Sequence, residues 1–405
     1  MPQPRAVVVG AGIGGLAAAA ALHRRGWSVT VLERAPSLEP VGAGIALAPN
    51  AQRALDVIGL GDTVRAMSAW QDEGGLRTPS GRWLSRTTQQ AAAERFGGPV
   101  VVAHRADLVA LLLSRLPEGV LRTGTPARLT DPGADGRPAT VRTDGGEEIT
   151  ADLVVAADGI HSAARAALFP GHPEPRHTGS TAWRFVVPAP ETPFTPHETW
   201  GRGALWGTVP LHDGRVYAYA TAVAPAGGRA PDGERAELLR RFGDWHRPVP
   251  ELIAAASDDA VLRNDVYRAA GPLPAHHRGR TALLGDAAHA MAPNLGQGGC
   301  QALEDAVVLA HHAAPDAADV PRALAAHTRD RLPRTTEVVR RSARVARLAG
   351  VSARPARALR DTALTVVDRF GPRLALRGLD GIADWRPPEP YAAGTRETTR
   401  ADTDR

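Results

Sequence analysis

Lysine is absent from this 405-residue chain, so all 48 basic residues are arginine. The absence excludes a lysine Schiff base and a pyridoxal-phosphate anchor. The one cysteine, Cys300, excludes an intramolecular disulfide and any zinc or iron–sulfur centre held by several thiolates. We therefore expect no metal centre of this kind and no covalent catalysis by lysine.

The composition is that of a globular protein, with 43% hydrophobic and 22% charged residues, and the length favours two or three domains. The net charge is only +5, and arginine is mixed with acidic residues along the chain. The densest basic stretch, Arg329–Arg347, alternates arginine with apolar residues at helical spacing. This pattern indicates the solvated face of a helix and disfavours a nucleic-acid partner.

The N-terminal residues can be interpreted in two ways. A basic start followed by the apolar run Ala6–Leu22 has the form of a secretory signal. The same residues also predict a buried strand at Ala6–Val9, a glycine turn, a helix at Leu16–Arg25 and a second strand at Ser28–Glu33. We favour this β-α-β unit. Since no segment is apolar and long enough to span a membrane, we expect a cytoplasmic protein.

The glycine turn fits a dinucleotide site. Gly10, Gly12 and Gly15 form the pattern G-x-G-x-x-G between the first strand and the helix, and Glu33 follows Gly15 by 18 residues. In such units the glycines allow a tight turn and the close approach of a pyrophosphate, and the acid binds a ribose. The helix N-terminus offers unpaired N–H groups to the phosphates. The pattern alone leaves FAD and NAD(P) open.

Two later segments have the same form, a strand followed by a turn and a helix. Asp158 and Gly159 end an apolar strand at Leu153–Ala157. Gly285 and Asp286 end another at Thr281–Leu284, and the loop Pro293–Gly299 then leads into a helix. An aspartate at a strand end can accept hydrogen bonds from hydroxyl groups, and successive glycine N–H groups can stabilise negative charge. These features predict a ligand close to the backbone.

In this order and spacing, the three segments resemble the single-component FAD-dependent aromatic hydroxylases and epoxidases, the p-hydroxybenzoate hydroxylase-like or group A flavoprotein monooxygenases. The resemblance covers about residues 4–345 and includes the sequences around Gly44 and Arg105. It implies the following FAD contacts: Gly10, Gly12, Ile13, Gly14, Gly15, Glu33, Arg34, Gly44, Ile45, Arg105, Asp158, Gly285, Asp286, Pro293, Gly296, Gln297, Gly298 and Gly299.

The resemblance also implies the reaction. NAD(P)H reduces FAD, O2 adds to the flavin as a C4a-hydroperoxide, and one oxygen atom is inserted into an aromatic or unsaturated small molecule by hydroxylation or epoxidation. The chemistry belongs to the flavin, so no protein nucleophile is expected. The flavin-side loop would consist of Pro293, Gly296, Gly298 and Gly299, and His289 and Cys300 are interpreted as packing residues.

A sheet in the middle of the chain is expected to bind the substrate. Thr181–Val187, Ala204–Val209 and Val216–Val223 alternate as strands do, but sequence does not fix which face points inward. The candidate substrate contacts are Trp183, Trp206, Tyr217 and Asn294. The resemblance implies that urate-type members of the family use an aspartate after this proline and an arginine on the sheet. Here Asn294 follows Pro293 and the strand at Ala204–Val209 has no arginine, so the sequence disfavours urate as the substrate.

The expected fold is α/β: a Rossmann-like FAD-binding domain of the glutathione-reductase type, an inserted mixed β-sheet domain and C-terminal helices. The expected segments are FAD binding at 1–175 and 271–345, substrate binding at 176–270, helices at 346–386 and a disordered tail at 387–405. Helices are predicted at Val320–Leu348 and Ala356–Phe370, interrupted by Pro333, Gly350, Pro355 and Gly371. We expect a monomer or homodimer. Two alternatives remain open: an FAD-dependent dehydrogenase or reductase on this scaffold, and a flavin-bound sensing or binding protein.

Overall fold

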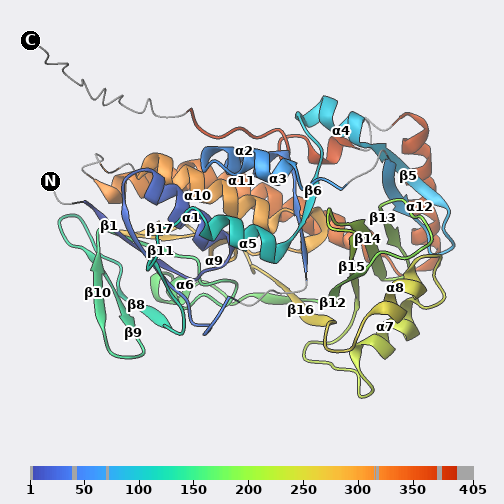
Figure 1. The fold of residues 1–405 in the computed structure, drawn as a ribbon, viewed down its shortest axis with the longest axis horizontal. Coiled ribbons are helices and arrows are strands. Elements are labelled where there is room, and N and C mark those ends of the chain that lie inside the picture. Colours follow the sequence, from blue (N-terminus) through green and yellow to red (C-terminus); the bar gives the residue numbers. More distant parts are fainter. Residues whose placement is uncertain are drawn as a thin grey trace, which may run out of the picture.

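The structure is a computed structural model that describes residues 3–38, 43–69, 73–313, 315, 319–371 and 376–389. The segment 39–42, within the sequence expected to lie near the flavin, and residues 390–405 of the predicted tail lie outside the described residues. Within them, two large sheets stand side by side, and the long helix α11 (Val320–Ala349) runs from one to the other (Figure 1).

The first large sheet has six strands in the order β17-β18-β11-β1-β2-β7, parallel except for β17. Its strands are β1 (Arg5–Val9), β2 (Ser28–Leu32), β7 (Leu121–Arg122), β11 (Leu153–Ala156), β17 (His277–Arg278) and β18 (Thr281–Leu283). The central strands are apolar runs because both faces of a parallel sheet are covered. The prediction of a Rossmann-like arrangement is confirmed.

One face of this sheet is covered by α1 (Ile13–Arg24), α10 (Gly298–His312) and α5 (Arg105–Leu113). The residues of α1 from Leu16 to Leu22, mostly alanine, are buried, so α10 can approach α1 closely. The other face packs against a three-stranded sheet of β8 (Ala127–Asp131), β9 (Ala139–Thr143) and β10 (Glu148–Ala151). The connections carry α2 (Pro49–Val57), α3 (Gly61–Arg65), α6 (Ala163–Leu168) and α9 (Asp286–His289).

The second large sheet has seven strands in the order β16-β12-β15-β14-β13-β4-β5. Its strands are β4 (Glu73–Arg77), β5 (Trp83–Thr88), β12 (Arg176–Pro188), β13 (His197–Trp200), β14 (Ala204–Pro210), β15 (Arg215–Val223) and β16 (Leu262–Arg268). The three strands predicted at its centre are present. The chain before residue 100 also contributes β4 and β5, which sequence patterning did not assign to this sheet.

Helices cover this sheet on one face and at one edge. α7 (Glu234–Phe242) and α8 (Val249–Ala255) pack on one face, and α12 (Arg354–Arg369) contacts β5 (Figure 1). The remaining elements are α4 (Gln89–Phe96), the two-stranded antiparallel sheet of β3 (Gly44–Leu47) and β6 (Val101–His104), and the 3-10 turns η1 (Pro293–Leu295) and η2 (Leu376–Leu379).

The predicted break at Pro333 is wrong, because α11 continues through this residue. Proline removes one backbone donor, but its ring is on the exposed side of a helix whose other face is buried. The other predicted ends hold: α11 stops before Gly350, Pro355 lies in the first turn of α12, and Gly371 follows that helix.

Candidate active site

The turn after β1 can be made only with glycine at two positions. A Cβ atom on Gly10, whose φ is +103°, would lie 2.5 Å from the carbonyl oxygen of Ala157. One on Gly15 would lie 1.9 Å from the carbonyl oxygen of Gly10. Gly12 differs, because a Cβ there would meet no protein atom within 4 Å. Gly10 and Gly15 therefore serve the fold, and the open space at Gly12 suits a ligand that approaches the backbone.

Two helix N-termini lack capping by the protein itself. α1 begins after Gly12 and α10 after Gln297; neither has a side-chain cap or an acidic residue in its first turn. A Cβ on Gly298, the first residue of α10, would also meet nothing within 4 Å. Uncapped N–H groups and the helix dipole favour negative charge at both places.

Glu33 lies beside the glycine turn, as its spacing predicts. Its Oε2 atom accepts the backbone N–H of Ala11 at 2.7 Å, and its Oε1 atom accepts that of Ala35 at 2.9 Å. The carboxylate is thus fixed at the end of β2, next to the N-terminus of α1. Arg34, the next residue, has an exposed side chain.

Asp286 and Arg105 are close enough to interact electrostatically. Asp286 follows Gly285 after β18. Its side chain is exposed, but the protein atoms around it desolvate the carboxylate and raise its pKa. Burial lowers the pKa of Arg105, with a further contribution from Arg184, while Asp286 opposes this shift. This part of the molecule therefore offers a carboxylate and a guanidinium that hydroxyl and carbonyl groups of a ligand could contact.

The two-stranded sheet of β3 and β6 separates Tyr217, in the seven-stranded sheet, from the glycine loop. A Cβ on Gly44 would lie 2.4 Å from the ring of Tyr217, so this ring packs directly on the backbone. On the other side, a Cβ on Gly299 would lie 2.7 Å from the side chain of Ile45. Gly44, Ile45, Tyr217 and the loop are therefore brought together, which sequence alone did not establish for Tyr217.

The Asp158 turn is tied to the same region. Asp158 Oδ2 accepts the N–H of Ala164 at 3.1 Å, whereas its Oδ1 atom is buried without a partner in the described structure. Arg165 reaches across and donates from Nη1 to the carbonyl of Ala287 in α9 at 3.0 Å. A buried oxygen without a partner is costly, so this atom is available to a ligand donor.

A buried charged network behind the glycine loop escaped the sequence analysis. Arg331 on α11 donates from Nε to Asp305 at 2.7 Å and forms an ion pair with Glu304, and all three side chains are at most 1% exposed. Asn50 donates to Glu304 at 2.7 Å and to Gln297 at 3.0 Å. The network thus joins α2, α10 and α11 to the residue that precedes Gly298. The pair Glu304-Asp305 in a helix next to the loop was the available signal.

The packing roles predicted for two other residues agree with their surroundings. His289 is buried and hydrogen-bonded to Asp305. Cys300 is buried, with its thiol directed at the carbonyl oxygens of Ala46 and Gly296, and burial raises its pKa to about 12. A thiol with this pKa is almost entirely protonated at neutral pH and is a poor nucleophile.

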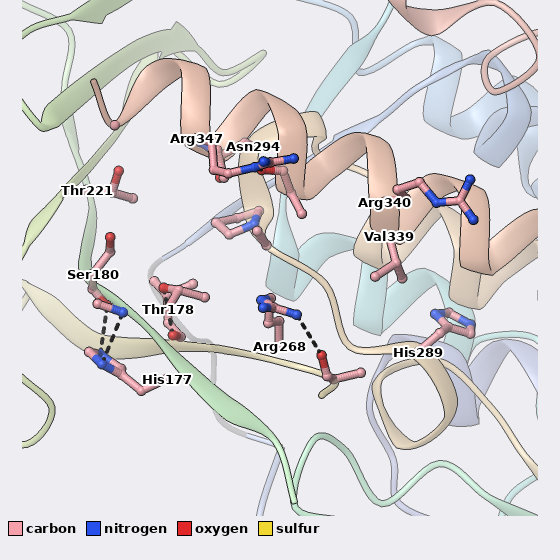
Figure 2. A pocket seen from close by; sticks show the side chains of 18 of the residues that line it. His177, Thr178, Ser180, Thr221, Arg268, His289, Asn294, Val339, Arg340 and Arg347 are labelled. Atoms are coloured by element: carbon pink, nitrogen blue, oxygen red, sulfur yellow. Dashed lines mark hydrogen bonds between the residues drawn. The ribbon is translucent and has the colours of Figure 1, made fainter. Parts of the chain in front are cut away.

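A pocket of about 960 Å³ lies between the seven-stranded sheet and α11 (Figure 2). Leu205 and Thr221 line it from the sheet, and Pro293 and Asn294 line it from the loop before α10. Of the residues predicted to contact FAD, all of which the structure describes, Pro293 alone lines this pocket. The pocket therefore adjoins the predicted cofactor site without coinciding with it.

Two of the predicted substrate contacts lie elsewhere, and this part of the expectation is corrected. Trp206 is fully buried and Trp183 is 2% exposed, both in the core between the sheet and the helices α7 and α8. Their neighbours in sequence point to the opposite face, because side chains alternate along a strand. Tyr217 is on that opposite face, where it meets Gly44, and Asn294 lines the pocket.

These observations suit FAD. The open space at Gly12 suits a pyrophosphate, and the fixed carboxylate of Glu33 suits a ribose. The unpartnered oxygen of Asp158 suits a hydrogen-bond donor of the ligand, and the uncapped N-terminus of α10 suits an electron-rich ring. Within the described ranges, no cluster of His, Cys, Asp or Glu could hold a metal ion, and no helix is long and apolar enough to cross a membrane.

The fold and the site define a flavin-binding α/β protein. The family model described as "FAD binding domain" matches residues 4–342, so the chain belongs to this family of FAD-dependent monooxygenases, which use NAD(P)H and O2. The resemblance predicted from the three segments is confirmed.

Individual relatives cover most of the chain. The aurachin C monooxygenase/isomerase of Stigmatella aurantiaca is 39% identical over 84% of this chain and 88% of its own. The 3-amino-4-hydroxybenzoate 2-monooxygenase of Streptomyces cremeus is 38% identical over 84% and 86%. The crystal structure of Klebsiella pneumoniae HpxO with FAD and uric acid superposes with a TM-score of 0.82 at 30% identity, covering 90% of this chain and 93% of that one.

Proposed function

We propose that the protein inserts one oxygen atom of O2 into an aromatic or unsaturated small molecule held in the pocket beside Pro293 and Asn294. The observation that carries this proposal is the position of the pocket, which shares the loop before α10 with the predicted flavin site. Sites of 300–1,000 Å³ with mostly apolar walls are typical of small-molecule binding. The named relatives act on aurachin C and on an aminohydroxybenzoate, which supports a ring-containing substrate.

We assign the chain's own residues to holding the cofactor. Glu33 would accept hydrogen bonds from ribose hydroxyl groups while it keeps the glycine turn in place. The backbone at Gly12, Ile13 and Gly14 would contact the pyrophosphate. Asp286 would accept hydrogen bonds from hydroxyl groups of the ribityl chain, and Arg105, close to Asp286, would donate hydrogen bonds to the cofactor. Three observations support these assignments: the carboxylate of Glu33 lies at the glycine turn, the backbone at Gly12 is open, and the guanidinium of Arg105 lies near Asp286.

The loop residues Gly296, Gln297, Gly298 and Gly299 would lie along the ring system. Bound FAD supplies the redox chemistry and the activation of O2. The N–H groups at the start of α10 would stabilise negative charge on the reduced ring. Tyr217, Ile45 and Gly44 would pack beside it and exclude water. The predicted domain segments, the monomeric or homodimeric state and the cytoplasmic location stay predictions.

The test is aerobic oxidation of NAD(P)H by the FAD-loaded protein with a panel of ring compounds, followed by mass analysis of the products. A compound that accelerates oxidation and returns one oxygen heavier supports the proposal. Acceleration with a product that has gained two hydrogens would support the reductase alternative, and a product that has lost two hydrogens and forms without NAD(P)H would support the dehydrogenase alternative. If no compound accelerates the reduction of the flavin by NAD(P)H, the result would support the alternative of a flavin-bound sensing or binding protein.

A further inference from the structure

The pocket between the sheet and α11 carries charge of one sign. Its lining includes Arg268, Arg340 and Arg347, and no aspartate or glutamate is among the described residues that form it. Over the whole chain acidic residues are nearly as frequent as basic ones, 43 against 48. A wall without carboxylates is therefore a local property of this pocket and does not follow from the composition.

Two of these arginines have no carboxylate partner in the part of the chain that the structure describes. Arg268 donates from Nη1 to the carbonyl oxygen of Ala269 at 3.2 Å. Arg347 makes only a long contact from Nε to the carbonyl oxygen of Ala343, at 3.4 Å. Arg340 differs, because Glu337 pairs with it at 3.0 Å. The positive charge of Arg268 and Arg347 thus remains available to a ligand.

Apolar side chains form part of the pocket wall, beside neutral polar ones such as Thr221 and Thr335. Leu205 and Val223 line it from the sheet, opposite Leu332, Val339 and Ala346 on α11. The residues of α11 that line it recur at helical spacing, so one face of the helix forms a wall several turns long. In Figure 2, Val339 and Arg340 lie toward the end near His289, whereas Arg347 and Asn294 overlap in this view at the other end, and both line the pocket. The wall therefore joins an apolar stretch to cationic groups near the loop of the predicted flavin site.

We propose that this pocket binds an amphipathic organic anion, with its apolar body between the sheet and α11 and its acidic group held by Arg268 and Arg347. Identification of this anion as the substrate rests on the proposed function, but the binding itself does not. A nicotinamide dinucleotide also carries anionic groups, so its phosphates are the competing source of negative charge.

Equilibrium dialysis of the FAD-loaded protein tests this proposal without turnover. The probes are 8-anilinonaphthalene-1-sulfonate, which is an anion, and N-phenyl-1-naphthylamine, which has the same ring systems without the charge. The variant R347E reverses a charge on the exposed rim of the pocket, where folding should be unaffected. The control R344E makes the same change at an exposed arginine of α11 that does not line the pocket.

We expect the anion to bind the parent protein with one site and more tightly than the neutral probe. R347E should weaken anion binding about tenfold and change binding of the neutral probe less than about twofold, while R344E changes neither. R347Q should give a smaller loss in the same direction. Equal binding of the two probes, an equal loss in R344E, or unchanged anion binding in R347E would overturn the proposal.

The source of the negative charge is tested separately. NADPH added to the dialysis should leave the bound anion in place. Displacement by NADPH would contradict a substrate pocket and assign the space to the dinucleotide. Because none of these measurements depends on oxygen insertion, an enzyme that fails the turnover test can still pass this one, and the reverse also holds.

Discussion

Asp305 joins the turn after β18 to the helix that follows the glycine loop. Its Oδ2 atom lies 2.5 Å from Nε2 of His289 and accepts the backbone N–H of Gly285 at 3.0 Å. Burial alone would raise the pKa of Asp305, but His289 and Arg331 hold it well below its usual range. An ionised aspartate can only accept, so His289 donates from Nε2. One carboxylate thus orients the residues on both sides of Asp286.

Arg331 is the fully buried cation that contacts both Glu304 and Asp305, and Arg334 pairs with Glu304 as well. The substitution Arg331→Met keeps an apolar stem of similar length but leaves Glu304 and Asp305 buried without this partner. Breaking a buried pair from one side costs about 3–5 kcal/mol. We expect a loss of this size in the free energy of urea unfolding. R322M, which removes an exposed pair with Asp319, should change it by less than about 0.5 kcal/mol. Equal losses in the two variants would contradict this account.

The two classes of glycine in the first turn should respond differently to substitution. Gly15→Ala forces a Cβ into the carbonyl of Gly10, so the apoprotein should melt well below the parent protein. Gly12→Ala places its Cβ in open space, so the fold should persist while FAD binding weakens. Melting temperature and FAD titration of each apoprotein separate the two effects. A G12A variant that binds FAD as the parent does would show that the pyrophosphate lies elsewhere.

Glu33 should contribute directly to FAD affinity. Glu33→Gln keeps the size of the side chain but replaces a charged acceptor, which we expect to weaken FAD binding about tenfold or more. Fluorescence quenching on titration of FAD into apoprotein measures the dissociation constant. Glu118 is an exposed residue of the same type, and E118Q provides the matched control. A similar affinity for E33Q and E118Q would remove the ribose assignment.

The burial of His327 should contribute to a fall in folding stability between about pH 6.5 and pH 4, to which His197, whose pKa is also lowered to about 4 by burial, adds. Burial lowers the pKa of His327 from 6.5 to about 4, and neither ring nitrogen has a partner in the described structure. In this range the unfolded chain binds a proton that the folded protein excludes, so folding stability rises with pH and is lost on acidification. The loss amounts to about 3 kcal/mol for this residue. His327→Leu should reduce the difference in the free energy of urea unfolding between pH 7 and pH 5, whereas the exposed control H212L should retain the full difference.

The cofactor-binding part of the fold could be predicted from the sequence because its glycine turns and strand ends have local sequence patterns. Gly10 and Gly15 lie where the turn of a β-α-β unit has no room for a side chain, and Glu33 lies beside that turn. The spacing of these three residues in the sequence predicts this arrangement. The strands of the second sheet were also predicted, since alternation is a local property. Which side chains of each strand face the core could not be predicted. Trp206 and Tyr217 are both aromatic residues in neighbouring strands, yet one is in the core and the other is against Gly44.

Contacts between segments that are distant in the sequence also could not be predicted. β4 and β5 join the seven-stranded sheet through pairing with β13, more than 100 residues away, and Arg331 meets Asp305 only because α11 folds over α10. The acid-free wall of the pocket has the same origin. Arg268 and Arg347 come from β16 and α11, and no sequence pattern relates two such residues.

The most direct test of the central claim is turnover of the FAD-loaded protein under ¹⁸O2 with NAD(P)H and a ring compound that stimulates NAD(P)H oxidation. The account predicts one ¹⁸O atom in the organic product and one in water. A product formed at the same rate without ¹⁸O, or with oxygen taken from the solvent, would contradict it.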